Sequence, residues 1–372
     1  MSVAERLQVF WDARVLEHDT GAGVFEAPAA PWLAVPELHP ENGNRVRNMH
    51  AVLEQGPVAA RLEWRPGREA DEAELETVHR PEYIASIRER CAAGGGRITP
   101  TTRLGAASWA PILVAAGTSL AAGDAVISGA TRMAYALVRP PGHHAQPACA
   151  DGYCFFNHAA LVAEAARRAG VARVAVVDWD VHHGNGTQAC FWERGDVLTI
   201  SLHMRTGLWG RTHQQTGSPG EIGVGDGAGR NVNVELGPGL GDRAYRLALE
   251  EVVLPVLRAF RPELLVGACG QDASAFDPNG RMNVSMDGFH AIGAFLRAAA
   301  GELCDGRVVL VQEGGYATTY AALCLHATLE GVLGEGRLLP DPLAYVPDDV
   351  ARARDAVDAT RSALSRHWTF PS

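Results

Sequence analysis

Four side chains that can bind metals or carry protons follow directly after one apolar run. Residues 173–177 read RVAVV, which is typical of a strand buried on both faces of a parallel sheet. The next six positions hold two carboxylates and two imidazoles: Asp178, Asp180, His182 and His183. Burying such groups costs free energy unless partners satisfy them, and open α/β sheets bind ligands at the carboxyl ends of their strands. This density predicts a functional site rather than a solvated turn.

A metal site is the first chemistry that these residues suggest. Asp180, His182 and Asp272 would supply two oxygens and one imidazole and leave a coordination position open, which suits a catalytic zinc ion. The spacing of Asp180 and His182 puts both side chains on the same side of an extended segment. Spacing alone would equally allow Mn²⁺ or Fe²⁺, and Asp272 taken by itself could be an ordinary loop carboxylate or helix cap.

Proton transfer is the second chemistry. His143 and His144 are adjacent at the end of another expected strand, so one could take a proton from water while the other gives one to a leaving amine. Asp178 and Asn185 are the natural orienting partners, and the carboxylate would make its histidine the more basic of the two. The alternative is a pair of hydrogen-bonded histidines in a turn.

The remaining candidates would handle the substrate. Gly314 and the glycine after it let the backbone approach a site closely, and the hydroxyl of Tyr316 could then donate to a developing oxyanion. Without such a site, Tyr316 would be a packed loop aromatic. Gly152 and Tyr153 follow the histidine pair and could form one wall of a narrow channel, with Trp209 opposite.

The order of apolar runs predicts the elements that carry these residues. Strands that alternate with helices indicate one α/β domain, over 1–372, with a mostly parallel sheet and helices on both faces. Strands are expected at 8–12, 134–138, 173–177, 196–202, 263–269 and 307–312. Helical segments are expected at 44–53, 66–82, 107–123, 157–168, 242–260, 286–303 and beyond 340, with a long loop at 205–230. Five of the strands end in polar or glycine-rich sequence, so their loops should converge on one edge of the sheet.

Whole-chain properties limit the class of protein. The chain has 372 residues and a net charge of −10, so it shows no electrostatic footprint for nucleic acid. Seven cysteines without a CxxC pair indicate reduced thiols, and the N-terminal segment lacks the apolar core of a secretory signal. We therefore expect a cytoplasmic protein. The most apolar stretch, 109–130, predicts a buried helix and a turn rather than a membrane span.

With these residues assembled, the sequence resembles the histone deacetylase superfamily. The shared motifs follow the family's order and cover roughly residues 134 to 320. They are RPPGHHA (139–145), DGYCFFN (151–157), VVDWDVHHGNGT (176–187), ISLH (200–203), GQDASAFDP (270–278) and EGGY (313–316). Asn185 and the Gly-Thr after it are similar to the class II branch, which includes bacterial histone deacetylase-like and acetylpolyamine amidohydrolases.

The resemblance implies a fold and two kinds of bound ion. The fold would be arginase-like, with a parallel sheet of about eight strands. One zinc ion per chain would be held by Asp180, His182 and Asp272. A structural monovalent cation, usually potassium, would lie at Asp178, Asp180, His182, Ser201 and Leu202, several of them contributing backbone carbonyls.

The resemblance also implies roles for the reactive side chains. His144 would be the principal general base, paired with Asn185, and His143 would be oriented by Asp178. Tyr316 would polarise the scissile carbonyl. The sequence departs from the family's usual pattern at Tyr153, where phenylalanine is common, and at Gln271, where many members have a small or apolar residue.

These observations favour a zinc-dependent hydrolase that removes an acyl group, most often acetyl, from an amine. Acetyl-lysine peptides, acetylpolyamines and other small amides all remain as substrates, and the chain could form a homo-oligomer. A binuclear manganese ureohydrolase would need a D-x-H-x-D arrangement, whereas Asp178, Asp180 and His182 come in another order. A non-catalytic member that binds acylated ligands would usually have lost Tyr316 or a zinc ligand, and this chain retains them.

Overall fold

An eight-stranded parallel sheet forms the centre of the protein. The computed structural model describes residues 6–21, 31–35, 38–205, 216–343 and 348–371. The strand order is β2-β1-β5-β10-β9-β6-β7-β8, and every pairing within this sheet is parallel. Its strands are β1 (Leu7–Trp11), β2 (Leu62–Pro66), β5 (Met133–Ala136), β6 (Val174–Asp178), β7 (Val197–Met204), β8 (Asn231–Leu236), β9 (Leu264–Cys269) and β10 (Val308–Gln312). A small antiparallel pair, β3 (Gly95–Arg97) and β4 (Arg103–Gly105), lies apart from it. The expected α/β class with a parallel sheet is confirmed.

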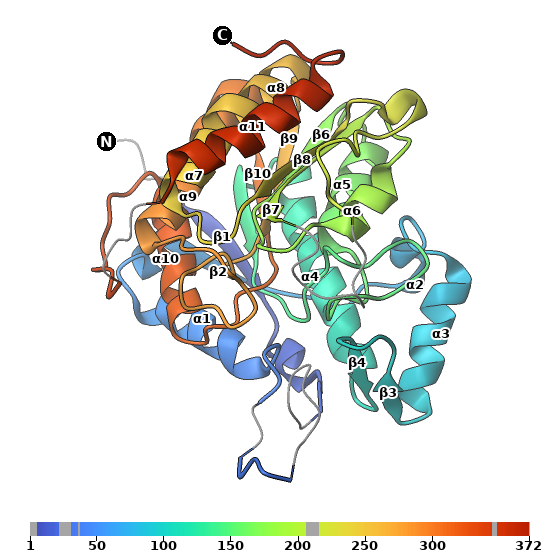
Figure 1. Cartoon of the computed structure of the whole chain (residues 1–372). Helices are drawn as coiled ribbons and strands as arrows, with labels where there is room; N and C mark the ends of the chain where they lie inside the picture. Colours follow the sequence, from blue (N-terminus) through green and yellow to red (C-terminus); the bar gives the residue numbers. More distant parts are fainter. Residues whose placement is uncertain (1–5, 22–30, 36–37, 206–215, 344–347, 372) are drawn as a thin grey trace.

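Helices cover both faces of the sheet (Figure 1). One layer holds α1 (Gly43–Gln55), α7 (Asp242–Ala248), α8 (Leu254–Phe260), α9 (Met286–Leu303), α10 (Tyr320–Leu333) and α11 (Val350–Leu364). The other side carries α2 (Glu72–Leu75), α3 (Pro81–Ala92), α4 (Trp109–Ile127), α5 (His158–Arg168) and α6 (Asn185–Phe191). Alternate residues of β6 enter the two cores: Val174 and Val176 face α4 and α5, while Ala175 and Val177 face the first layer. A strand buried on both faces therefore needs the continuous apolar run that the sequence shows.

The strand register brings the polar strand ends to one edge of the sheet. Asp178, the last residue of β6, pairs with Ser201 of β7 and with Ala268 of β9. Gln312, the last residue of β10, pairs with Cys269 of β9. Because all these strands run in the same direction, the loops that follow them meet above the same edge.

Several elements differ from the sequence expectation, and each has a physical reason. The charged segment 66–82 was expected to be helical up to Pro81, but only Glu72–Leu75 is helical and Pro81 begins α3. That expectation was wrong because proline suits the first turn of a helix as well as it ends one. The edge strands β2 and β8 mix polar and apolar residues and do not show the apolar run of a central strand. Helix α10 was missed because it is buried almost all round and lacks an amphipathic pattern.

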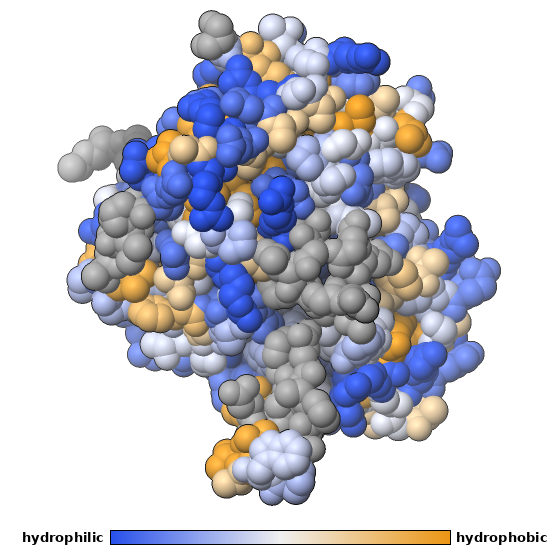
Figure 2. All heavy atoms as spheres, in the orientation of Figure 1, coloured by the Kyte–Doolittle hydropathy of each residue, from blue (hydrophilic) through white to orange (hydrophobic). Residues whose placement is uncertain are grey.

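Helix α4 is long and apolar enough to pass for a membrane span by length and composition. Two-thirds of that stretch (67%) is buried inside the fold, as expected for a core helix. The expectation of a buried helix in this region agrees with the structure. Figure 2 shows a visible face on which hydrophilic residues predominate and hydrophobic ones are scattered between them.

Buried neutral histidines should make the fold sensitive to acid. Burial lowers the pKa of His79 and of His158 to about 4, from a usual value near 6.5. Between about pH 6.5 and pH 4 the unfolded chain then binds more protons than the folded one, so stability falls as the pH falls through this window. With about 1.4 kcal/mol per pKa unit, each histidine should cost about 3 kcal/mol of stability at low pH.

Urea unfolding at a series of pH values tests this prediction. We expect the difference in unfolding free energy between the unchanged protein and a His79→Gln variant to be constant above about pH 7 and to change steadily below about pH 6.5, to the disadvantage of the unchanged protein. The difference is the quantity to follow, because other buried groups with raised pKa values contribute with the opposite sign, and they do so in both proteins. A difference that stays constant down to about pH 5 would contradict the prediction.

Candidate functional site

Three potential metal ligands meet above the ends of β6 and β9. A carboxylate oxygen of Asp180, a ring nitrogen of His182 and a carboxylate oxygen of Asp272 all lie within 4.8 Å of one another. His182 Nδ1 is 2.9 Å from Asp180 Oδ1 and 3.0 Å from Asp272 Oδ2. Both carboxylates are completely buried. The structure thus brings together the three side chains that the sequence singled out.

The electrostatics of this cluster show an excess of buried negative charge. Burial raises the pKa of Asp272 to about 7, and the nearby Asp180 adds to the effect. Burial opposes a charged imidazole, but hydrogen bonds to Asp180 and Asp272 outweigh it and raise the pKa of His182 to about 10. A proton on His182 therefore offsets the carboxylates in the absence of another cation. A divalent cation in the same place would neutralise both carboxylates and take the imidazole lone pair.

The two adjacent histidines sit in opposite electrostatic environments. His143 Nδ1 is 2.8 Å from Asp178 Oδ2, whereas His144 Nδ1 is 2.6 Å from Asn185 Oδ1, and the two rings lie 4.1 Å apart. Burial disfavours a charged His143, but the carboxylates of Asp180 and Asp178 outweigh it and raise its pKa well above the usual value. Burial, together with its charged histidine neighbours, lowers the pKa of His144 well below the usual value. One imidazole is thus held protonated and the other neutral, which suits a proton donor and a proton acceptor.

Two glycines make room for this arrangement. A Cβ on Gly314 would collide with the carboxylates of Asp272 and Asp180, and the Gly314 amide donates to Asp180 Oδ2 at 2.8 Å. A Cβ on Gly152 would collide with the His144 ring, and the backbone there has a φ of +50°. Any larger residue at either position would therefore displace one of these carboxylates or the His144 ring.

Tyr316 is held by its backbone rather than by its hydroxyl. Its amide donates to Asp277 Oδ2 at 2.6 Å, and the next amide, Ala317, donates to the same oxygen at 3.2 Å. From the other side, Arg45 donates through Nε to the Gly315 carbonyl at 2.8 Å and lies over the Tyr316 ring, 5.1 Å from its centroid. A buried carboxylate and a buried guanidinium thus fix the turn on which the ring is carried.

Tyr153 lies beside Tyr316, where the sequence predicted a channel wall. The two rings meet edge to face, with centroids 5.6 Å apart, and Tyr153 Oη accepts a hydrogen bond of 3.2 Å from Asn279 Nδ2. The ring of His39 also contacts the Tyr153 ring, with the two centroids 5.0 Å apart. The other expected wall residue, Trp209, lies outside the described residues.

A second group of buried polar residues supports the site, and of these only Gln271 was singled out in the sequence, without a role. The backbone N–H of Gln271 donates to the Gly314 carbonyl at 3.1 Å, and its side-chain Oε1 accepts from Gln312 Nε2 at 2.8 Å. Tyr135 donates 2.6 Å to Gln312 Oε1. The residue at 271, an unusual one for the resembled family, therefore belongs to a network beneath the glycine turn. Isolated buried glutamines such as these leave no periodic pattern in a sequence. For Asp277, which supports Tyr316, the following Pro278 was a visible sign of a turn.

The residues expected to bind potassium lie on and just after the neighbouring strands β6 and β7. Asp178 pairs with Ser201 in the register of β6 and β7, and Leu202 follows on β7. Ser201 Oγ lies 2.9 Å from His203 Nδ1 and accepts 3.3 Å from the Gly184 amide. Potassium binding at this place stays a prediction.

The chain is similar to known proteins of one family over most of its length. The sequence model of the histone deacetylase domain matches residues 39–332. Histone deacetylase 8 of Arabidopsis thaliana is 47% identical over 364 residues, covering 97% of each chain. The histone deacetylase-like amidohydrolase of Pseudomonas aeruginosa is 40% identical over 344 residues, covering 92% of this chain and 90% of the relative.

A more distant relative and a solved structure extend the comparison. The human polyamine deacetylase HDAC10 is 34% identical over 343 residues, which are 90% of this chain and 50% of that protein. The crystal structure of the HDA15 HD domain superposes with a TM-score of 0.85 at 32% identity, covering 98% of this chain and 96% of that one.

Proposed function

The chain belongs to the histone deacetylase family, which includes deacetylases and amidohydrolases, and from this premise we propose that it is a zinc-dependent amidohydrolase. It would cleave the acyl amide of an amine, in the first place an N-acetyl group. The observation that carries the proposal is the meeting of the Asp180, His182 and Asp272 cluster with an oppositely tuned histidine pair. No other arrangement in the described residues combines metal ligands with a proton donor and acceptor in this way.

The donor set fits zinc. Asp180 and Asp272 are completely buried carboxylates that face one imidazole, and this set of two oxygens and one nitrogen leaves a coordination position for substrate or water. When bound, zinc would polarise the acyl carbonyl and lower the pKa of an attacking water. The second carboxylate oxygens are already fixed by backbone amides: Val181 donates to Asp272 Oδ1 at 2.8 Å, and Gly314 donates to Asp180 Oδ2.

The histidine pair would then move the protons. The lowered pKa of His144 favours the neutral ring, and Nδ1 faces Asn185, so Nε2 would accept the proton of the attacking water. His143 is held protonated by its carboxylate neighbours, so it donates a proton to the leaving amine. Tyr316 donates from its hydroxyl to the oxyanion that forms on the carbonyl.

Positioning of Tyr316 should depend on Asp277, which leads to a prediction. Asp277→Ala removes the acceptor of three backbone amides, those of Tyr316, Ala317 and Asn279. We expect kcat to fall by about 10- to 100-fold through misplacement of the tyrosine ring, with zinc content retained. Asp277→Asn keeps one acceptor oxygen and should recover part of the loss.

A double-mutant cycle distinguishes positioning from a general loss of stability. Because Asp277 acts through Tyr316, Asp277→Ala should have little further effect on kcat in a Tyr316→Phe background. Steady-state kinetics of the four proteins measures this coupling. Independent effects that multiply in the double variant would show that Asp277 does not act through the tyrosine.

The amidohydrolase proposal is tested with a small panel of substrates and the zinc-loaded protein. The panel holds an acetyl-lysine peptide, an acetylated diamine, a trifluoroacetyl-lysine reporter and a simple aryl amide. We expect hydrolysis of at least one of them, lost on removal of zinc and restored by its return. The ranking of the substrates would separate a peptide deacetylase from one that acts on small acetylated amines. No hydrolysis of any of them by protein with one zinc per chain would contradict the proposal.

A further inference from the structure

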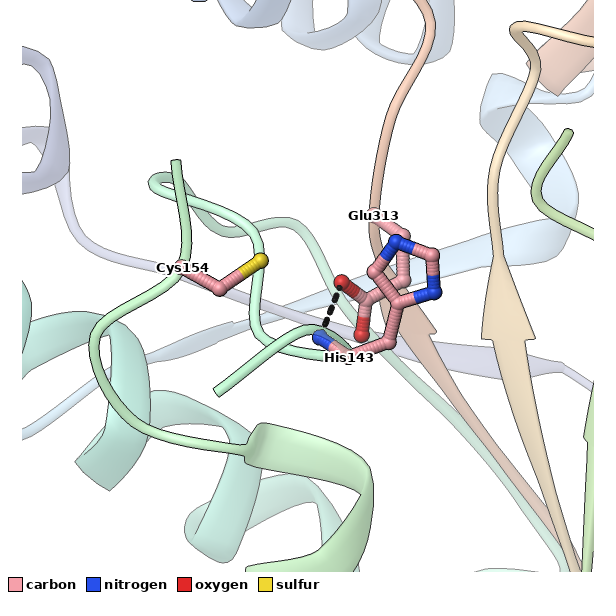
Figure 3. A group of neighbouring side chains, drawn as sticks. All are labelled: His143, Cys154 and Glu313. Carbon is pink, nitrogen blue, oxygen red and sulfur yellow. Dashed lines mark hydrogen bonds between the residues drawn. The ribbon is translucent and has the colours of Figure 1, made fainter. Parts of the chain in front are cut away.

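A second cluster of possible metal ligands includes His143, one of the two adjacent histidines of the site. A ring nitrogen of His143, the thiol of Cys154 and a carboxylate oxygen of Glu313 lie within 4.8 Å of one another, and all three residues are buried. They come from the loops after β5 and β10 and from the segment before α5. Figure 3 shows the thiol of Cys154 and the carboxyl group of Glu313 pointing toward one another, with the His143 ring beside them. None of these three residues belongs to the Asp180, His182 and Asp272 cluster.

Only one of the two carboxyl oxygens of Glu313 is hydrogen-bonded within the described residues. Its Oε2 accepts from the Gly142 amide at 2.6 Å and from the His143 amide at 3.1 Å. Its Oε1 is buried and has no hydrogen-bond partner among the described residues. Burial raises the pKa of Glu313 to about 8, and the charges of Asp178 and Asp180 also favour the protonated acid. A buried carboxyl oxygen without a partner is costly, and a cation would satisfy it.

Cys154 is poised as a ligand rather than as a nucleophile. Its thiol makes a weak hydrogen bond of 3.3 Å to the Gly152 carbonyl. Burial raises the pKa of this thiol well above the usual value, so the thiolate needs a positive partner to form. A soft metal ion supplies that partner and displaces the thiol proton to solvent.

We propose that His143, Cys154 and Glu313 form a second binding site for a thiophilic divalent cation such as zinc, and that its occupation stops turnover. Nitrogen, sulfur and oxygen ligands in one buried cluster suit zinc or cadmium and disfavour magnesium or calcium. The two ring nitrogens of His143 face Asp178 and Asp180, at 2.8 Å and 3.6 Å. A metal bound to either nitrogen takes the place of one of these contacts, so His143 can no longer serve as the proton donor to the leaving amine. The binding part of the inference stands alone, whereas the inhibition rests on the proposed function.

Cadmium added to the zinc-loaded protein tests the binding part. We expect about one further equivalent to bind with an ultraviolet thiolate-to-metal charge-transfer band, and we expect Cys154→Ser to abolish that band. Exchange of cadmium for the first zinc does not produce the band, because that cluster contains no sulfur. Cys149→Ser is the matched control, since it removes the exposed cysteine nearby and should keep the band. A band that persists in Cys154→Ser, or its absence from the unchanged protein, would overturn the site.

Zinc titrations of turnover test the inhibition. Excess zinc should inhibit the unchanged protein and Cys149→Ser alike, while Cys154→Ser should need at least about tenfold more zinc for the same inhibition. Turnover of Cys154→Ser at limiting zinc shows that this variant is folded, and Cys154→Ala serves if it is not. Equal inhibition of all proteins would refute the regulatory role even where the band is present. If neither the unchanged protein nor any variant hydrolyses substrate even at limiting zinc, while the cadmium band is present, the proposed function is rejected and the second binding site still stands.

Discussion

Tyr316→Phe is expected to lower kcat by about 100- to 1000-fold while the protein keeps its zinc and its stability. This is the usual loss when one donor to a developing oxyanion is removed, about 3–4 kcal/mol of transition-state stabilisation. The fold should not suffer, because the hydroxyl makes no hydrogen bond within the described residues and the ring is held by Asp277 and Arg45. The effect should therefore appear in kcat and not in the zinc content or the melting temperature.

Tyr320→Phe is the matched control for this experiment. Tyr320 is buried to the same extent as Tyr316, each being 6% exposed, and lies four residues further along the chain. Its hydroxyl donates to Asp341, which does not belong to the Asp180, His182 and Asp272 cluster. We would measure kcat of the two variants on the best substrate of the panel and the zinc content of the same samples. The expected result is a loss of kcat in Tyr316→Phe alone, with the same zinc content in both. Equal turnover by Tyr316→Phe and the unchanged protein would refute the assigned role of the hydroxyl.

The second large effect is expected from Asp272→Asn, which should weaken zinc binding by more than about 100-fold and abolish turnover at limiting zinc. Losing an outer hydrogen-bond partner of a zinc ligand already costs about 10- to 100-fold in affinity, so losing a ligand charge should exceed that range. Asparagine keeps the shape of the side chain and can still accept from the Val181 amide. The loss therefore reports on the charge rather than on the fold.

Competition with a metal-binding chromophore measures this affinity, and high zinc should restore part of the turnover. Asp348→Asn is the control, because Asp348 is also a buried carboxylate that accepts from backbone amides, those of Gly241 and Ala244. It lies in the segment before α11, and its substitution should leave the zinc content unchanged. Asp272→Asn protein that retains one tightly bound zinc would show that Asp272 is not a ligand.

The sequence determined the centre of the sheet and the residues that meet above it. Strands buried on both faces must be continuously apolar, so β6, β9 and β10 were visible as runs that end in polar residues. Parallel direction then requires those ends to meet, which places Asp180 and Asp272 in one cluster although 92 positions separate them in the sequence. The spacing of Asp180 and His182 likewise predicted that these two side chains lie on the same side of their segment.

Tertiary structure alone decided the edges of the fold and the support of the site. The edge strands β2 and β8 have only one neighbour each, so their sequences need not be apolar, and α10 is buried all round and shows no period. Asp277, Arg45 and Glu313 act through hydrogen bonds to backbone groups far away in the chain. Every residue type except proline has both a backbone N–H and a carbonyl. The segments that these side chains contact therefore show no sequence pattern that would reveal the contact. For the histidine pair the sequence predicted that Asp178 would make its partner the more basic residue, whereas burial and the charges of His143 and His182, which lower the pKa of His144, come from the fold.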